Sequence, residues 1–428
     1  MKRILFSLLI IFLLQACKKN DHGDNSVTRP NILLIIADDM GLDACPGYGF
    51  SSTQPQMPNL DKWITSGIKF NNFWTYPTCT PTRGSILTGK YGFRTGVQNV
   101  GDVLSISENS LHQELKNSGY ATGQFGKWHL SNDATQPNAM GIDNFEGIII
   151  GAVPSYTNWT LSSNGTSSTE TTYTTTKLTD LAIDWIAKQD KPWFTWMAYN
   201  APHTPFHLPP DLLHEQGSLP NDQASIDANP LPYYLASLEA LDKEMGRLLN
   251  SLSAAERENT LIIFIGDNGS PGQVAQVYSN RRVKGSIYQG GVNCPLIVSG
   301  KGVNRFAASE NALVSTVDLH STILAAANLT STKKIDSESF YGLLSDEKSV
   351  TKEINYTEIR KTNGTVDETV RDATHKYMLF GDGSESLYDL EQNPLENPNL
   401  LSANQAPLST SDSLIWVKLK EKMIELKQ

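Results

Sequence analysis

The sequence predicts a layered α/β fold, in which buried strands alternate with amphipathic helices. Apolar runs typical of strands buried on both faces of a parallel sheet occur at 31–38, 193–203, 261–269 and 294–300. Apolar residues recur at helical three- and four-residue intervals at 178–186, 235–252 and 317–327. In open α/β sheets chemistry gathers at the carboxyl ends of the strands, so polar residues at those ends are the first candidates for a site.

The rest of the chain has a different composition. Residues 151–176 are rich in Ser, Thr, Asn and Gly, which predicts a surface excursion, and 204–230 carry the Pro, Asn and Asp of a long loop near the site. From about residue 351, short strand-like pieces precede a helix predicted at 411–427. We therefore expect a main α/β domain at 30–350 and a small C-terminal subdomain of antiparallel strands and a helix at 351–428.

The amino-terminal end predicts export. Residues 1–16 have the basic start and short apolar run of a signal peptide, too short for a stable membrane span. Cys17 follows a small residue, as in a bacterial lipoprotein signal in which the new terminal cysteine carries the lipid; an ordinary secretory signal is the alternative. Residues 17–29 form a polar tether. We expect a protein anchored by lipid in the cell envelope, in the periplasm or on the surface.

The net charge argues against a nucleic-acid partner. The chain has 428 residues and a formal net charge of −10, whereas phosphate contacts need clustered Lys and Arg. A small anionic substrate stays possible, because a site needs only a few cations placed locally.

The cysteines are too few for a disulfide-stapled scaffold, since the chain has four: Cys17, Cys45, Cys79 and Cys294. Cys45 and Cys294 either pair or stay as buried thiols. Cys79 lies in CTPTR before a helix predicted to begin at Gly84–Thr88, where the helix N-terminus and Arg83 would lower a thiol pKa. This pattern permits a cysteine nucleophile, although no Cys–His pair is visible in the sequence.

Two pairs of oxygen ligands follow predicted strands. Asp38 and Asp39 are adjacent carboxylates, which repel one another unless a cation or a shared proton holds them together. Asp267 and Asn268 add a carboxylate and a neutral oxygen from a second strand end. Such all-oxygen ligation favours Ca²⁺ or Mg²⁺ over zinc. Either pair alone is weak evidence for a metal site, because Asp-Asp and Asp-Asn-Gly occur in many turns.

Basic and proton-carrying side chains form a second group of candidates. Lys127 and His129 are two apart in GKWHL, and alternate residues of an extended segment point the same way. His203 follows a predicted strand and precedes prolines, and Lys284 precedes glycines where the backbone can approach a ligand closely. The alternatives are structural histidines and solvated lysines.

In order along the chain, these motifs resemble the sulfatase family of the alkaline-phosphatase-like superfamily. CTPTR at 79–83 matches the C-x-P-x-R signature, and PNILLIIADDMG at 30–41 resembles the metal-binding entry strand. GKWHL, PHTP, GDNG and KGSIYQGG follow in the family's order, and 318–328 and 386–401 resemble later landmarks. The resemblance covers roughly residues 30–401. It implies a large, mixed, mostly parallel sheet sandwiched by helices, and a sulfuric ester hydrolase. The lipoprotein-like start and the long Ser/Thr/Asn loops favour a sulfated carbohydrate as the substrate.

The resemblance also implies that Cys79 is not used as a thiol. In such enzymes a maturation enzyme, reading the Pro81 and Arg83 positions, oxidises this cysteine to Cα-formylglycine during export. One hydroxyl of the hydrated aldehyde then attacks sulfur and displaces the alcohol. A base next removes the proton from the second hydroxyl, so that sulfate leaves and the aldehyde is restored.

The site roles follow residue by residue from the resemblance. The metal, Ca²⁺ rather than Mg²⁺, would be held by Asp38, Asp39, Asp267, Asn268 and the modified Cys79. Arg83 would stabilise the formylglycine hydrate, and Lys127 and Lys284 would bind sulfate oxygens. His129 would be the base of the elimination, and His203 would bind sulfate and help to protonate the leaving oxygen.

One departure and several alternatives stay open. Gln289 stands where relatives often have a glutamate before two glycines. A phosphodiester or phosphonate monoester hydrolase of the same superfamily would use nearly the same residues. A non-catalytic carbohydrate-binding relative would have no need for the complete set, and a phosphotransferase using Thr80 or Thr82 is a more distant alternative.

Overall fold

The computed structural model describes residues 29–331, 333, 335–346 and 352–428. The predicted signal peptide, Cys17 and nearly all of the tether lie outside the described residues. Within the described part of the chain, no helix has the length and apolar character needed to cross a membrane.

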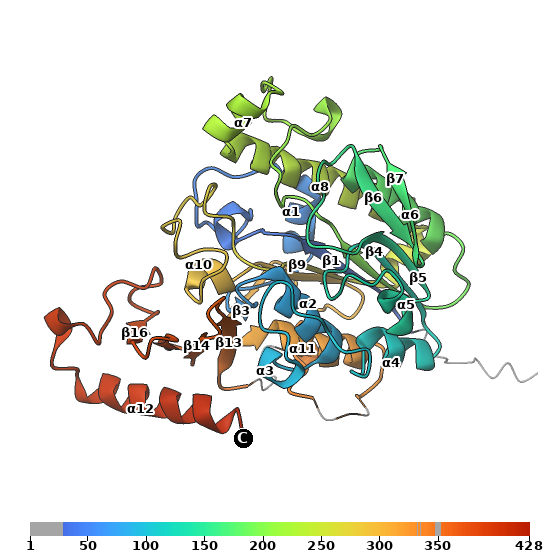
Figure 1. Cartoon of the computed structure of the whole chain (residues 1–428). Helices are drawn as coiled ribbons and strands as arrows, with labels where there is room; N and C mark the ends of the chain where they lie inside the picture. Colours follow the sequence, from blue (N-terminus) through green and yellow to red (C-terminus); the bar gives the residue numbers. More distant parts are fainter. Residues whose placement is uncertain (1–28, 332, 334, 347–351) are drawn as a thin grey trace, which may run out of the picture.

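A ten-stranded mixed sheet forms the centre of the molecule (Figure 1), with strand order β11-β2-β10-β9-β1-β8-β4-β5-β6-β7. Its parallel core consists of β1 (Asn31–Ala37), β4 (Ala121–Lys127), β5 (Asn144–Ile148), β8 (Trp193–Ala198) and β9 (Thr260–Gly266). The flanking strands are β2 (Gly67–Phe70), β6 (Trp159–Ser163), β7 (Thr166–Glu170), β10 (Leu296–Gly300) and β11 (Ala308–Glu310). The predicted fold class is therefore confirmed.

Two strand assignments differ from the sequence-based expectation. The 294–300 run is a strand, but β10 pairs antiparallel with β9 and reverses the direction of the sheet there. The region 151–176 is not only a surface excursion, because β6 and β7 form a hairpin that extends the sheet antiparallel from β5. The polar sequence of β7 (TSSTE) hides this strand, since an edge strand needs no apolar face.

Helices cover both faces of the sheet. On one face, α1 (Pro58–Thr65), α6 (Thr174–Ile186) and α8 (Leu231–Ser251) pack on Leu33 and Ile35 of β1. On the other, α2 (Cys79–Thr88), α4 (Leu111–Asn117) and α11 (Thr316–Ala326) pack on Ile32 and Leu34. Successive β1 residues thus serve opposite layers, as the continuous apolar run predicts.

The connections carry short elements. These are β3 (Phe73–Trp74), β12 (Val314–Ser315), α3 (Gly92–Thr95), α5 (Gln136–Ala139), α7 (Gln223–Ala228), α9 (Ala254–Glu258), α10 (Gln289–Val292), η1 (Leu42–Ala44), η2 (Asp211–Leu213) and η3 (Tyr341–Leu344). The predicted loop at 204–230 is irregular apart from η2 and α7.

The carboxyl-terminal part forms a four-stranded antiparallel sheet in chain order, with a helix packed on it (Figure 1). The elements are β13 (Asn355–Arg360), β14 (Val366–Arg371), β15 (His375–Leu379), β16 (Glu385–Asp389), η4 (Ala403–Gln405) and α12 (Thr410–Glu425). Leu419 and Met423 of α12 pack among apolar residues of this sheet. The boundary predicted at residue 350 falls among residues outside the description and stays a prediction.

Candidate active site

The carboxylate pairs meet at the carboxyl ends of β1 and β9. Ala37 and Gly266 are register partners, so Asp38 and Asp267, the next residues, leave neighbouring strands side by side. Asp39 has a left-handed backbone conformation, with φ 76°, and its backbone N–H donates to Asp267 Oδ1 at 3.0 Å. Asn268 Nδ2 donates to Asp39 Oδ1 at 2.7 Å. These four residues are at most 1% exposed, and the strand register and the hydrogen bonds bring them together.

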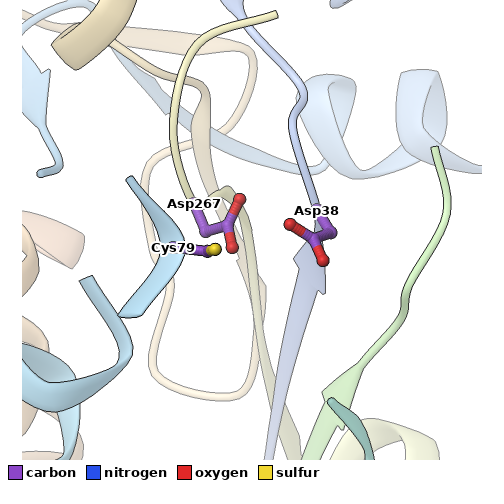
Figure 2. Close-up of side chains that lie close together, drawn as sticks. All are labelled: Asp38, Cys79 and Asp267. Carbon is purple, nitrogen blue, oxygen red and sulfur yellow. The ribbon is translucent and has the colours of Figure 1, made fainter. Parts of the chain in front are cut away.

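Cys79 enters this cluster from the first residue of α2, several residues earlier than the predicted helix start. Figure 2 shows its sulfur directed at the carboxylates of Asp38 and Asp267. The three side chains each offer a ligand atom, and these atoms lie within 4.8 Å of one another. A second such group is formed by Asp38, Asp39 and His203. The structure therefore brings the predicted metal ligands and Cys79 to one point.

The state of the Cys79 thiol corrects the sequence-based expectation. Burial raises its pKa above the ordinary value, and the charges of Lys127 and Lys284 do not offset burial and the nearby carboxylates. The helix N-terminus therefore does not make this thiol acidic. A Cys–His contact that the sequence does not reveal is present, with Cys79 Sγ 3.2 Å from His129 Nδ1. The two groups stay neutral, unlike a thiolate–imidazolium nucleophile.

His129 reaches the site by a different geometry from the one predicted. It has φ 58°, so GKWHL is not extended through this residue. Burial, together with the positive charges of Lys127 and Arg83, lowers its pKa to about 2. The backbone of Gly151 covers the ring, because a Cβ there would lie 2.4 Å from Nε2. A neutral imidazole is thus held against the side chain of residue 79 and is available to accept a proton.

Two lysines neutralise the first carboxylate pair. Lys127, at the end of β4 and fully buried, places Nζ 2.6 Å from Asp38 Oδ2. Lys284 places Nζ 2.6 Å from the Asp39 carboxylate, and this carboxylate raises the Lys284 pKa although burial lowers it. Both ammonium groups therefore lie at the Asp38 and Asp39 carboxylates.

His203 approaches from the loop after β8. Its Nε2 is 3.7 Å from Asp39 Oδ2, and its Nδ1 is 2.8 Å from the carbonyl oxygen of Thr204. Since a carbonyl only accepts, Nδ1 donates and Nε2 is the nitrogen that faces the site. The structure thus gathers every predicted site residue around Asp38 and Asp39.

Arg83 is the buried cation between the two strand ends. Its Nη2 is 2.8 Å from Asp267 Oδ2 and 3.7 Å from Asp38 Oδ2, and its Nη1 donates to the Lys127 carbonyl at 2.9 Å. Burial lowers its pKa, but Asp267 and Asp38 raise the pKa more. Arg83 therefore holds α2, β1, β4 and β9 in one arrangement.

Replacing Arg83 by Met is expected to destabilise the fold by about 3–5 kcal/mol, because it strands buried carboxylates without their partner. The matched control is Arg94→Met, which removes a partly exposed pair with Asp336 at 2.7 Å and should cost no more than about 1 kcal/mol. Urea unfolding of both variants measures the difference. Equal losses would show that the Arg83 network contributes no more than a surface ion pair.

The oxygen atoms of the site fit a hard divalent cation. Asp38 Oδ1 and Asn268 Oδ1 are buried and have no hydrogen-bond partner among the described residues. A metal ion would satisfy both, together with oxygens of Asp39 and Asp267. Without an ion, the charges of Asp38, Asp39 and Asp267 are balanced by those of Arg83, Lys127 and Lys284. A divalent ion would therefore leave a net positive site that attracts an anionic ester.

Sequence reasoning missed the residues that position the site. Tyr234 Oη donates to the Asp39 carbonyl at 2.8 Å, and Thr82 Oγ1 donates to the Asp267 carbonyl at 2.8 Å. Tyr156 Oη lies 2.7 Å from the carbonyl oxygen of His203. Only Thr82 carried a signal, because it lies inside the CTPTR motif. Tyr156 comes from a turn in the region predicted as a surface excursion, and Tyr234 comes from α8, which has the pattern of an ordinary amphipathic helix.

The other cysteines and Gln289 have structural surroundings. Cys45 and Cys294 are buried free thiols and form no disulfide. Gln289 begins α10, and its Oε1 accepts from Trp74 Nε1 at 3.0 Å. At this departure from the family pattern, the side-chain oxygen of Gln289 is thus hydrogen-bonded.

A mixed α/β sheet whose strand ends gather buried carboxylates, cations and a cysteine at a helix N-terminus has the arrangement of the alkaline-phosphatase-like class. The sequence model of the sulfatase family matches residues 30–329, and the chain belongs to this family of sulfuric ester hydrolases.

Curated relatives and solved structures agree with this assignment. Arylsulfatase J of Mus musculus is 28% identical over 340 residues, 73% of this chain and 55% of that protein. A sulfatase of Formosa agariphila is 27% identical over 503 residues, 94% of this chain and 89% of that protein. The crystal structure of Ps i-CgsB in complex with k-i-k-neocarrahexaose has a TM-score of 0.80 at 23% identity, covering 94% of each chain. BT4656 in complex with its substrate D-glucosamine-2-N,6-O-disulfate has a TM-score of 0.78 at 20% identity, covering 93% of this chain and 98% of that one.

Proposed function

We propose that this chain releases inorganic sulfate from a sulfated carbohydrate, using formylglycine made from Cys79 and a bound divalent metal, Ca²⁺. The observation that carries the proposal is the position of residue 79. Its side chain, at the start of α2, meets the metal-type oxygens of Asp38 and Asp267 and the neutral ring of His129. A buried thiol whose pKa is raised is a poor nucleophile there, whereas a precursor of another group fits.

The comparisons support the choice of a carbohydrate. One similar structure is a complex with k-i-k-neocarrahexaose, and another is a complex with D-glucosamine-2-N,6-O-disulfate. A cavity of about 280 Å³ opens beside the loop after His203, lined by Thr204, Pro205, Phe206, Gln223, Asp227, Pro230 and Gln273. Polar side chains beside an aromatic ring suit a sugar next to the sulfate.

When formylglycine and the metal are both present, the hydrated aldehyde supplies an oxygen nucleophile and the metal supplies Lewis acidity. Asp38, Asp39, Asp267 and Asn268 would hold the ion. Lys127 and Lys284 would bind the sulfate oxygens, on which charge must be stabilised as the S–O bond breaks. Their ammonium groups are held by carboxylates in advance, so little reorganisation is needed.

Proton transfers fall to the two histidines. His129 Nδ1 lies next to the side chain of residue 79 and, being neutral, would take a proton from it when sulfate is released. His203 presents Nε2 beside Asp39, where it would bind sulfate and help to protonate the leaving alcohol. The partner required before catalysis is a formylglycine-generating maturation enzyme.

Mass spectrometry of the peptide containing Cys79 tests the proposal. Protein made with the maturation enzyme should show residue 79 with an aldehyde oxygen in place of the thiol, and sulfate release should rise with the modified fraction. An unmodified thiol throughout a fully active preparation would refute the formylglycine mechanism.

We further propose that the chain is exported and anchored by a lipid on Cys17. The signal-like residues 1–16 and the polar tether after them support this proposal. Protein from the native cell type should partition into detergent, and Cys17→Ala should move it to the aqueous phase. Equal partitioning of the two chains would exclude the anchor.

A further inference from the structure

A second cavity, of about 580 Å³, lies between the main sheet and the carboxyl-terminal sheet. Asn71 and Asn72 reach it from the end of β2, Asn293 from the residue after α10, and Arg371 from the end of β14. Phe50 and Tyr278 also line it. None of the predicted catalytic or metal-binding residues belongs to its wall, so it is a different place from the active site.

Arg371 is a buried cation on this wall without a carboxylate partner. It is 3% exposed, and its guanidinium donates to Asn72 Oδ1, the Asp372 carbonyl and the Ala373 carbonyl, each at 2.9 Å. These acceptors are all neutral, and no carboxylate of the described residues forms an ion pair with it. Burial lowers its pKa to about 10. A guanidinium has five N–H donors, so some stay available for an anion.

The nearby carboxylates are committed elsewhere. Glu396 pairs with Lys376 at 2.7 Å and accepts the backbone N–H of Gln289 at 2.8 Å. Asp372 Oδ1 accepts the backbone N–H groups of Thr374 and His375. Because burying an unpaired charge is costly, an arginine kept in this state is a candidate for binding an anionic ligand.

The other walls offer groups that bind a polyol. Asn293 is 6% exposed, its Nδ2 donates to the Asn71 carbonyl at 3.1 Å, and its Oδ1 is buried without a partner among the described residues. The rings of Phe50 and Tyr278 stack with centroids 6.4 Å apart. Amides can bond hydroxyl groups and ring faces can pack on C–H groups, and a volume of this size is typical of small-molecule sites.

We propose that this cavity is a non-catalytic binding site for an anionic saccharide, with its acidic group on Arg371 and its hydroxyls on the asparagines. The choice of sulfate as the acidic group rests on the proposed function. Glu391 also lines the cavity and is exposed. Its carboxylate repels an anion, so the acidic group of the ligand is expected at the Arg371 end of the cavity. The site would hold a sulfated chain on the protein independently of cleavage.

The test uses the full chain carrying Cys79→Ala, so that the probe is not consumed. Calorimetry measures binding of a sulfated galactan tetrasaccharide, its desulfated counterpart and inorganic sulfate, and hydrogen exchange locates the contact. We expect the sulfated tetrasaccharide to protect the segments at 71–74 and 371–375. Arg371→Gln should reduce that protection and weaken binding at this site at least tenfold.

A second variant avoids the buried arginine. Asn311 is exposed on the cavity wall, and its Oδ1 accepts from Asn71 Nδ2 at 2.7 Å. Asn311→Asp keeps this acceptor and adds a negative charge, so the sulfated probe should bind at least threefold more weakly and the desulfated one unchanged. The matched control is Asn363→Asp, an exposed asparagine whose Oδ1 likewise accepts, from Thr365, outside this cavity.

The results separate this inference from the proposed function. Sulfate release by Arg371→Gln in a chain that retains Cys79 should stay within twofold of the parent on a small aryl sulfate. Unchanged binding and protection in both Arg371→Gln and Asn311→Asp would overturn the inference even if the enzyme is active. Protection of the segments at 71–74 and 371–375 by inorganic sulfate but not by the tetrasaccharide would also overturn it. If the matured parent chain releases no sulfate but the cavity still binds the tetrasaccharide, the proposed function alone is refuted.

Discussion

Replacing Cys79 by Ala is expected to reduce sulfate release on the order of 10⁴-fold or more, because the variant lacks the precursor of the nucleophile. The fold should survive, since the Cys79 side chain makes one hydrogen bond, to His129, and an alanine fits at the start of α2. Initial rates of sulfate release, normalised to folded protein from thermal unfolding, measure the effect.

Cys294→Ala is the matched control for this change. Cys294 is also fully buried, and its sulfur also has one hydroxyl or ring neighbour, Thr75 Oγ1 at 3.3 Å. It should cost stability and leave the rate per folded molecule within about twofold. A Cys79→Ala chain as active as Cys294→Ala would show that the nucleophile lies elsewhere in the site.

Protein made with and without the maturation enzyme separates two kinds of chemistry at residue 79. A thiolate nucleophile would work in protein made without the maturation enzyme and would be blocked by a thiol-alkylating reagent. The formylglycine mechanism predicts the opposite: unmodified protein is inactive, and matured protein resists the reagent. The raised pKa of the Cys79 thiol and the neutral His129 favour the second result.

The sequence predicted well those site residues that directly follow a buried strand. Asp38 and Asp267 each follow a continuous apolar run, which the sequence shows directly. Because β1 and β9 are parallel neighbours in register, the two residues lie side by side. The order of the motifs, through the resemblance to the sulfatase family, then predicted that Lys127, His203 and Lys284 belong to the same site. The layered α/β core followed from the alternation of strands and helices, and the large mixed sheet followed from the resemblance to the sulfatase family.

The sequence predicted less well what depends on burial and on local backbone shape. Local charge indicated an acidic Cys79 thiol, whereas burial decides its pKa. Extended geometry was expected for His129, yet it has positive φ. Strand β7 was missed because exposed edge residues show no apolar pattern, and the positioning hydroxyls of Tyr156 and Tyr234 come from distant elements.

Removal of divalent metal should abolish sulfate release, and added Ca²⁺ should restore it. Two observations support this expectation: the partnerless buried oxygens Asp38 Oδ1 and Asn268 Oδ1, and the balance of charges at the site without an ion. Ion binding should also raise the midpoint of thermal unfolding with Ca²⁺ concentration, because the ion binds the folded state. Chelation, elemental analysis and unfolding with graded Ca²⁺ provide three separate readouts.

Asn268→Leu tests the ligand set itself. Leucine has a similar volume but no oxygen, and the side chain otherwise loses only its donation to Asp39 Oδ1 and to the Gly269 carbonyl. We expect Ca²⁺ affinity to fall about 10–100-fold, the scale seen when a metal site is perturbed, with activity recovering at high Ca²⁺. Asn268→Asp, which keeps an oxygen and adds charge, should retain Ca²⁺ binding.

The contrary result would have a definite structural meaning. If chelation leaves both activity and the unfolding midpoint unchanged, the carboxylates serve as partners of Arg83, Lys127 and Lys284 rather than as metal ligands. In that case Asn268→Leu would leave activity and the response to Ca²⁺ unchanged and would cost only its two hydrogen bonds, whereas loss of any of the three cations would be more costly. Since the two arrangements use the same carboxylates, the response of Asn268 decides between them: its Oδ1 has no described partner unless an ion is bound.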